Sequence, residues 1–421
     1  MVAAGLASIA CLTRGSETTP QEIYVWQRQW TPAVVTSLHE LAPATEAFLV
    51  LAAEVSWRDG AMDVFVARPD YAALKRERVN AGLVVRLGSY DGLFSAKDAT
   101  AQRLREIVRD VLRNARENGV EPVEVQIDFD CAENKLARYG EWLRTLRSEL
   151  GTTRLTFTAL PAWLRHESDF RALAAMADGF VLQVHSLEKP RGVDEPIVLC
   201  DPARVNAWVR AASEVGVPFR VSLPTYGYEV GFDVGGKFIG LAAEGPRREL
   251  PQGTRIRIVR AEVEAMRQLA RELSECPARG CEGVIWFRLP VDADRLNWDV
   301  RTLAAVMRGK VPEARLHMCI EWSSSEEGLV EIVAENKGDR EAVLPTRIRA
   351  YWTQDARALA MDSVGNYTLT TNTPPGEAVW SQTETSRSRM IRPGRRARVG
   401  WIKFFHETAL QIEVSDAFSN K

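Results

Sequence analysis

The sequence predicts a (β/α)8 TIM barrel followed by a small C-terminal β-sandwich-like domain. Eight short apolar runs alternate with period 2 between Ile23 and Pro290, and amphipathic segments with helical spacing separate several of them. The helical patterns stop after Lys310-Val-Pro312, where short strand-like runs begin. Eight strands alternating with helices are typical of a closed parallel barrel. The predicted divisions are a signal-like segment and linker at 1–21, the barrel at 22–310 and the β-rich domain at 311–421.

Length and charge limit the possible functions. A chain of 421 residues with 46% hydrophobic content is long enough for a large domain and a smaller one. Its 54 basic and 56 acidic residues give a formal charge of -2, so no global positive field is available to attract nucleic acid. No nucleic-acid partner is expected, and the sequence does not predict the oligomeric state.

The N-terminal segment has the pattern of an exported protein. A short apolar run, Val2 to Leu12, is followed at once by the polar stretch Arg14 to Gln21, as in a secretory signal. Ser8-Ile9-Ala10-Cys11 resembles the lipobox of bacterial lipoproteins, and this resemblance implies a lipid anchor at Cys11. The expected location is the periplasm or the outer membrane; the alternative is a cytoplasmic tail with an incidental cysteine.

The elements of the barrel follow in order along the chain. The predicted strands are 23–30, 48–57, 83–90, 123–130, 155–161, 179–187, 219–229 and 283–290. The clearest helices are predicted at 99–118, 139–150, 202–215 and 260–275, and a modest helix at 64–79. After the seventh strand comes a long Gly-rich loop, which we expect to be a lid or a substrate wall over the catalytic face.

The C-terminal region reads as a set of short strands. They are predicted at 329–334, 346–352, 379–381 and 397–405, with turns at 336–338 and 392–394. This domain could bind glycans or could serve as a structural partner of the barrel.

The cysteines give little evidence of a metal or redox site. The six cysteines include no CxxC pair, and no Gly-rich phosphate loop follows a strand, so neither a metal nor an organic cofactor is expected. Cys276 and Cys281 flank a short loop that a disulfide could close; two free thiols are equally compatible with the sequence.

The fourth predicted strand carries the strongest functional signal. In Val123-Glu-Val-Gln-Ile-Asp-Phe-Asp130, period-2 alternation places Asp128 and Asp130 on one face, pointing into the barrel. In a TIM barrel the C-terminal ends of the strands carry the active site. Two carboxylates at this position indicate acid–base chemistry.

This segment is similar to a motif of the family 18 glycoside hydrolases, Asp-Gly-x-Asp-x-Asp-x-Glu. Asp128 matches an Asp of the motif, Asp130 stands at its general-acid Glu, and Gln126 replaces another Asp. Leu223-Pro-Thr-Tyr-Gly227 and Gly283-Val-Ile-Trp286 are similar to the family's seventh and eighth strands, although the family's Trp aligns with Phe287. The whole chain resembles a bacterial family catalogued as domain of unknown function 3142. The resemblance implies a carbohydrate ligand or substrate.

The resemblance implies that Asp130 is the general acid and Asp128 a supporting carboxylate. Like charges in close proximity raise one pKa, which would keep Asp130 protonated. Because Asp is one methylene shorter than Glu, the barrel could instead have lost hydrolysis and kept binding.

Ends of other strands supply candidate substrate-binding groups. They are Tyr24, Trp26, Glu54, Arg86, Gln126, Gln183, His185, Tyr226, Tyr228, Trp286 and Arg288. Trp26, Tyr226 and Trp286 would stack on sugar rings, unless they are core aromatics. Glu54 interrupts an apolar run, so it is either a barrel carboxylate paired with an Arg or a second catalytic group. We expect it to pair with Arg86, because an unpaired buried charge is costly. His185 is expected to be a satisfied core histidine rather than a base.

Three functions remain open from the sequence. They are an exported glycoside hydrolase, a non-catalytic glycan-binding envelope lipoprotein that uses the same cleft, and a structural protein of the cell envelope.

Overall fold

The computed structural model describes residues 19–92, 94–244, 251–353, 355–370, 376–383 and 390–415. Cys11 lies outside the described residues, so its predicted lipidation stays a prediction. The chain divides into two compact units, one ending at Gly309 and the other beginning at Lys310.

The first unit is a closed barrel of eight parallel strands. They are β1 (Gln21–Val25), β2 (Ala47–Arg58), β4 (Asn80–Leu87), β5 (Glu124–Phe129), β6 (Arg154–Ala159), β7 (Gly179–Gln183), β8 (Phe219–Pro224) and β12 (Cys281–Phe287). The ring closes because β1 pairs in parallel with both β12 and β2. The predicted fold class and its eight strands are confirmed.

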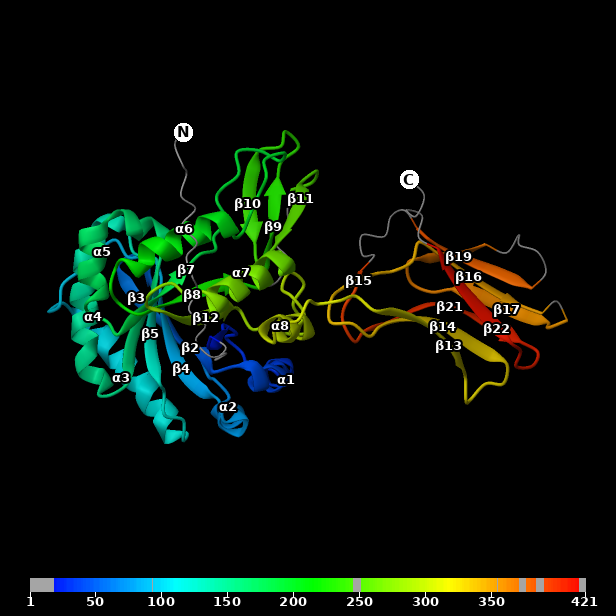
Figure 1. Cartoon of the computed structure of the whole chain (residues 1–421), viewed down its shortest axis with the longest axis horizontal. Coiled ribbons are helices and arrows are strands. Elements are labelled where there is room, and N and C mark those ends of the chain that lie inside the picture. The colour runs from blue at the N-terminus through cyan, green and yellow to red at the C-terminus, as the bar shows by residue number, and fades with distance from the viewer. Residues whose placement is uncertain are drawn as a thin grey trace, which may run out of the picture. The chain divides into compact units, whose positions relative to one another are not determined.

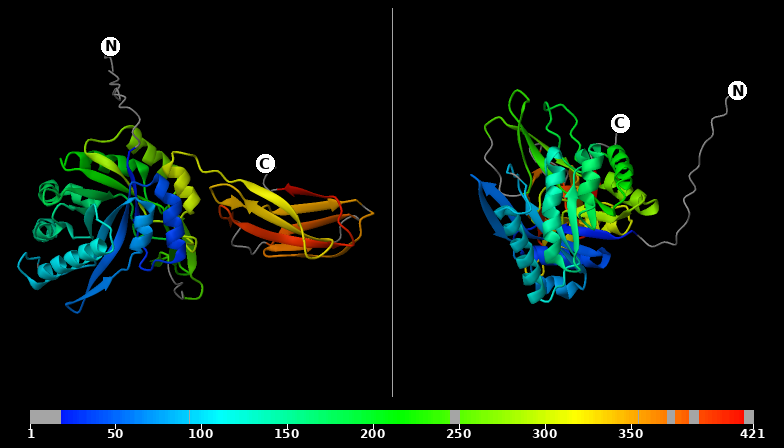
Figure 2. Two further views of the ribbon diagram at one scale, coloured as in Figure 1. Left: turned by 90° about the horizontal axis from the view of Figure 1, so that it is seen from below. Right: turned by 90° about the vertical axis from the view of Figure 1, so that its left-hand side faces the viewer.

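Helices surround the strands (Figures 1 and 2). They are α1 (Pro32–Leu41), α2 (Tyr71–Glu77), α3 (Ala99–Glu117), α4 (Leu136–Leu150), α5 (Glu167–Ala174), α6 (Pro202–Ser213), α7 (Val263–Glu275) and α8 (Val300–Met307). Helix α3 shows why the sequence forms them: Leu104, Ile107 and Val111 are buried on one face. The Asp98 carboxylate caps its N-terminus by accepting a hydrogen bond from the Ala101 amide at 2.7 Å.

The link between the second and third barrel strands differs from the prediction. Residues 64–66 do not begin a helix, because they end β3 (Ala61–Val66), which pairs antiparallel with β2. Asp59 and Gly60 form the connecting turn with φ of 51° and 79°, the geometry of a two-residue hairpin. Only the second half of the predicted segment is helical, as α2.

The Gly-rich insertion after the seventh barrel strand is a small antiparallel sheet rather than a loop. Its strands are β9 (Gly227–Phe232), β10 (Phe238–Ala242) and β11 (Arg255–Arg260), in the order β10-β9-β11. They stand together beside the barrel (Figure 1). The predicted strand 219–229 is therefore two strands, β8 and β9. A Cβ at Gly227 would lie 2.4 Å from the Val259 carbonyl oxygen, so this close approach requires glycine.

The second unit consists of antiparallel sheets. Its strands are β13 (Leu316–Trp322), β14 (Leu329–Asn336), β15 (Ala342–Val343), β16 (Arg347–Trp352), β17 (Ala358–Ser363), β18 (Tyr367–Thr370), β19 (Glu377–Gln382), β20 (Met390–Ile391), β21 (Arg396–Phe404) and β22 (Leu410–Ser415). Two four-stranded sheets, β13-β14-β21-β17 and β18-β19-β16-β22, contribute to one hydrophobic core. Ile332 and Ile402 come from the first sheet, and Ile348 and Trp380 from the second.

Candidate functional site

A cavity of about 710 Å³ opens at the C-terminal ends of the barrel strands. Its lining comes from β1, β2, β4, β5, β6, β7, β8 and β12, and from the inserted sheet. The lining residues are Tyr24, Trp26, Arg28, Glu54, Arg86, Asp128, Asp130, Thr158, Gln183, His185, Ser222, Tyr226, Gly227, Tyr228, Ala243, Glu244, Phe287 and Arg288. Most of the predicted site residues therefore meet in one place; Gln126 and Trp286 do not line it.

The two carboxylates of the β5 motif lie at different depths. Asp128 is buried, and one of its oxygens accepts a hydrogen bond from the Thr158 hydroxyl at 2.7 Å. The other oxygen forms an ion pair with Arg86. Asp130 follows the strand, leaves 55% of its side chain exposed and lies 3.5 Å from Arg86 Nη2. The Arg86 guanidinium thus forms ion pairs with both carboxylates.

The electrostatics of Asp130 suit a proton donor. Partial burial raises the pKa of Asp130 above its usual range, and the neighbouring Asp128 raises it further, while Arg86 opposes both. The net direction is upward, so the protonated form of Asp130 persists to a higher pH than that of an isolated Asp.

The predicted ion pair between Glu54 and Arg86 is wrong. Glu54 pairs with Arg28 at 2.5 Å, although β2 and β4 place Glu54 beside Arg86. The β4–β5 register also places Arg86 beside Asp128. Asp128 and Asp130 together place two carboxylates next to Arg86, whereas Glu54 offers one. Arg86 therefore forms its ion pairs with Asp128 and Asp130.

On the opposite wall, His185 is held between two hydroxyl groups. Its Nδ1 lies 3.2 Å from the Tyr226 hydroxyl and its Nε2 lies 3.1 Å from Ser222 Oγ. Burial lowers the pKa of His185 to about 3, so the ring is neutral near neutral pH. It also stacks on Phe287 with a centroid distance of 5.3 Å. The expectation of a satisfied histidine rather than a base agrees with these contacts.

Aromatic rings line the β1 side of the cavity. Trp26 packs edge-on against Tyr24 and Phe287 at 5.7 and 5.2 Å, and the Arg86 guanidinium lies 5.8 Å from the centre of the Trp26 ring. An aromatic wall next to carboxylates suits a ligand that has both apolar faces and hydroxyl groups.

Trp286 is a core residue, which is the alternative to sugar stacking that the sequence left open. It is fully buried, its Nε1 donates to Gln21 Oε1 at 2.9 Å, and it packs against Trp298. Successive residues of a strand point to opposite faces, so Phe287 occupies the inward position on β12.

Gln126 lies beneath the cavity and is fully buried. It accepts a hydrogen bond from the Tyr24 hydroxyl at 2.5 Å, and its amide donates to Thr156 at 3.3 Å. Its predicted contact with a ligand is therefore wrong, because both ends of the amide are engaged inside the barrel.

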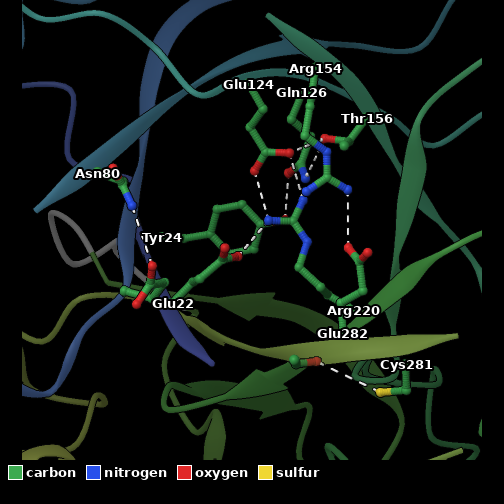
Figure 3. A network of polar contacts seen from close by, with 12 residues as sticks. Glu22, Tyr24, Asn80, Glu124, Gln126, Arg154, Thr156, Arg220, Cys281 and Glu282 are labelled. Carbon is green, nitrogen blue, oxygen red and sulfur yellow. Dashed lines mark hydrogen bonds and ion pairs between the residues drawn. The ribbon is translucent and has the colours of Figure 1, made fainter. Parts of the chain in front are cut away.

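A buried ionic network fills the barrel below Gln126 (Figure 3). The Arg220 guanidinium donates to Glu22 at 2.5 Å and to both oxygens of Glu124 at 2.8 and 2.6 Å. The Thr156 hydroxyl also donates to Glu124, at 2.8 Å. The charged residues of this network stand near the N-terminal ends of β1, β5 and β8, at the opposite ends of these strands from the cavity.

The inserted sheet completes one wall of the cavity. It contributes Tyr228, and the segment after β10 contributes Ala243 and Glu244. Glu244 is fixed by accepting a hydrogen bond from the backbone N–H of Asn297 at 3.0 Å. The nearby Arg288 forms an ion pair with Asp294 at 2.8 Å. The insertion is therefore a wall of the cavity.

The sequence did not single out Thr158, Ser222, Arg28 or Glu244. Thr158 and Ser222 were recognisable in principle as inward positions of period-2 strands near their C-terminal ends. Arg28 and Glu244 lie in connections, and no local pattern predicts where a connection folds back.

No group of three His, Cys, Asp or Glu among the described residues could hold a metal ion. Within the same part of the chain, no helix is long and apolar enough to cross a membrane. Cys281 is a free thiol whose Sγ lies 3.9 Å from the Gly283 carbonyl oxygen.

Comparison with known structures bears on the fold. A chitinase from Chromobacterium violaceum ATCC 12472 is 15% identical, with a TM-score of 0.50 over 69% of this chain and 98% of that one. The C-terminal domain of a candidate chitinase from Desulfitobacterium hafniense DCB-2 is 12% identical, with a TM-score of 0.50 over 69% and 99%. At these identities the likeness shows the barrel fold alone. A search of curated proteins found no match.

Family models match both units of the chain. The family described as Domain of unknown function (DUF8456) matches residues 321–404. The family described as Domain of unknown function (DUF3142) matches residues 81–292, half of the chain. The chain therefore belongs to the DUF3142 family, and its barrel has the same fold as the chitinase structures compared above.

Proposed function

We propose that this protein is a glycoside hydrolase of a polysaccharide or an amino-sugar glycan, with Asp130 as general acid and Asp128 as supporting carboxylate. The observation that carries the proposal is the pair itself: Asp130 has a raised pKa and lies beside the buried Asp128 in a cavity of about 710 Å³. A cavity of this size is in the range that holds small organic ligands.

The chemistry needs a proton for the leaving oxygen and stabilisation of an oxocarbenium-like centre. Asp130, exposed at the mouth and with a raised pKa, would supply the proton. Asp128, fixed by Thr158 and Arg86, would lie below the sugar ring as the supporting carboxylate. The stabilising group could be Asp128 or the substrate's own acetamido group.

Aromatic and hydroxyl groups would orient the sugar. Trp26 and Phe287 offer apolar faces for its C–H groups, and Tyr226 and Tyr228 offer hydroxyl groups. His185, being neutral, would act only as a hydrogen-bonding support for Tyr226.

The position of Arg86 beside both carboxylates favours a second candidate function, which is glycan binding without hydrolysis. The Arg86 guanidinium contacts both carboxylates and offsets part of the rise in the pKa of Asp130, which opposes proton donation. Asp130 is also shorter than the Glu of the related motif, and a misplacement of about 1 Å can reduce the rate on the order of a hundredfold.

The test is hydrolysis of a panel of bacterial and N-acetylated oligosaccharides, with products detected by mass spectrometry. Wild type is compared with Asp130→Asn and with Asp169→Asn, which removes an exposed carboxylate on α5 outside the cavity. For a hydrolase we expect cleavage to fall at least about a hundredfold in Asp130→Asn, as for loss of a general acid. Asp169→Asn should behave as wild type.

Binding separates the two functions. A hydrolase with Asp130→Asn should still bind its substrate, whereas a binding protein should bind without cleavage in all three forms. Cleavage that survives Asp130→Asn unchanged would remove Asp130 from the mechanism.

We also propose that the protein is exported and anchored in the cell envelope through Cys11. The apolar run 2–12 and the lipobox-like Ser8-Ile9-Ala10-Cys11 support this. A glycan substrate of the bacterial envelope would be accessible from that location.

A further inference from the structure

We propose that the C-terminal unit carries a second glycan-binding site, centred on Trp401, for a neutral oligosaccharide chain. The site belongs to the outer face of the β13-β14-β21-β17 sheet and uses no residue of the barrel cavity. It therefore stands independently of the proposed hydrolysis.

The sheet is hollowed at this point. A cavity of about 580 Å³ lies over β14, β21 and the end of β17. Its lining residues are Glu326, Leu329, Glu331, Ala360, Val364, Arg398, Gly400, Trp401 and Lys403. The volume is of the size that holds a short oligosaccharide segment.

Trp401 occupies the centre of this face. It is opposite Glu331 on β14 and Asp362 on β17, so a strand flanks it on either side. Its neighbour Ile402 is fully buried in the sandwich core. Period-2 alternation therefore turns Trp401 outward, where it is only partly buried.

Other tryptophans of this unit have packing partners, and Trp401 differs from them. Trp322 and Trp352 pack against Phe404 at 5.9 and 5.1 Å, and Trp380 is fully buried. Among the described aromatic residues, none has its ring against Trp401. A large apolar ring facing a cavity without an aromatic partner is available to a ligand.

The charged groups around Trp401 are paired with one another. Arg398 lies 3.2 Å from Glu331, and Lys403 lies 2.8 Å from Glu326. The rim thus offers donors and acceptors without a net positive field, which argues against nucleic acid or an anionic membrane as the ligand. Leu329, Ala360 and Val364 add apolar lining.

A neutral sugar chain fits both parts of this surface. The C–H face of a pyranose would lie on the indole ring, and its hydroxyl groups would exchange hydrogen bonds with the ionised side chains at the rim. Hydrogen bonds to charged groups are the stronger ones. A sugar has an apolar face surrounded by hydroxyl groups, and this surface has an indole ring surrounded by charged side chains.

The test uses the full chain with Asp130→Asn as background, so that the polymer is not degraded. Binding to insoluble chitin and cellulose is measured for this background and with Trp401→Ala, Trp401→Phe or Tyr351→Ala added. Tyr351 is the matched control, because it is an aromatic residue, 39% exposed, on β16 of the other sheet. We expect Trp401→Ala to weaken binding to one polymer about tenfold, while Trp401→Phe and Tyr351→Ala change it less than about twofold.

A site-resolved readout separates this site from the barrel cavity. In ¹H–¹⁵N spectra, the indole signal of Trp401 is identified by its loss in Trp401→Phe, and that of Trp26 by its loss in Trp26→Phe. Chitohexaose and cellohexaose serve as probes. We expect a saturable shift of the Trp401 signal whether or not the Trp26 signal responds.

Two results would overturn the proposal. One is equal binding of the Trp401 variants and their background with a Trp401 signal that neither probe moves. The other is absence of binding to both polymers and both probes. If only the hydrolysis assay fails, the proposal of the Trp401 site still stands. Polymer binding and the Trp401 signal test that site, and cleavage tests Asp130.

Discussion

Glu22 and Glu124 share a single guanidinium inside the barrel, and one arginine can balance only one of two buried carboxylates. Burial raises the pKa of Glu22 from 4.5 to about 7, although Arg220 opposes it. Glu124 is buried as well, but its two contacts with Arg220 and one with Thr156 hold its pKa below the usual value. Glu22 thus carries a proton as the pH falls below about 7, while Glu124 stays ionised.

This pKa predicts a pH-dependent stability. Because the folded-state pKa of Glu22 lies above its ordinary value, the folded protein binds an additional proton between about pH 4.5 and 7. The stability that Glu22 contributes is full below pH 4.5 and is lost as the pH rises through 7. Glu22→Gln cannot ionise, so it should remove this loss, which is up to about 3 kcal/mol.

Urea unfolding at several pH values measures this effect. Glu282→Gln is the control, because Glu282 forms an ion pair with Arg154 that is about half exposed on both sides. In the control, the free energy of unfolding should fall with pH between 4.5 and 7 as steeply as in wild type. If it falls equally steeply in Glu22→Gln, Glu22 is ionised in the folded protein throughout this range.

At the scale of elements, the interior of the barrel limits residue size. In β4, Gly82 packs where a Cβ would lie 2.9 Å from Glu124 Cγ and 3.3 Å from Leu49 Cγ. Gly82→Ala should therefore displace the Glu124 side chain from Arg220 and lower the free energy of unfolding by about 1–3 kcal/mol.

Gly240→Ala in β10 is the matched control, since nothing lies within 4 Å of the Cβ that it would add. Chemical unfolding of both variants compares a strand glycine inside the barrel with one on the inserted sheet. Equal stabilities would mean that the barrel interior accommodates the added methyl group by a small shift.

Two elements were assigned wrongly from the sequence for the same reason. In β3 and in the β9-β10-β11 insertion, short antiparallel strands interrupt a βα connection where the fold pattern suggests a helix or loop. Asp59-Gly60 was a recognisable hairpin signal. The glycines of the insertion permit several conformations, so their pairing depends on contacts with the rest of the unit.

At the scale of the whole molecule, the two units have separate hydrophobic cores, and the proposed glycan sites lie one in each. A chain with two such sites would act on polymers rather than on free monosaccharides. This expectation depends on both proposals.

Export is also a property of the whole chain. If Cys11 is lipidated, wild-type protein expressed in a bacterium with lipoprotein processing should fractionate with membranes, and Cys11→Ser should not. Cys200→Ser is the control, because Cys200 is buried inside the barrel unit. Equal fractionation of wild type and Cys11→Ser would exclude the anchor.

The sequence by itself determined the properties that depend on local periodicity: the eight barrel strands, α3, α4, α6 and α7, and the placement of Asp128 and Asp130 at the end of one strand. Period-2 and period-3.6 patterns involve only residues that are close together in the sequence, so they can be recognised without knowing the fold. Tertiary structure alone decided which partner Arg86 takes and that Glu22 and Glu124 share Arg220. These outcomes depend on the register between strands far apart in the chain and on competition among buried charges, and neither is a local property of the sequence.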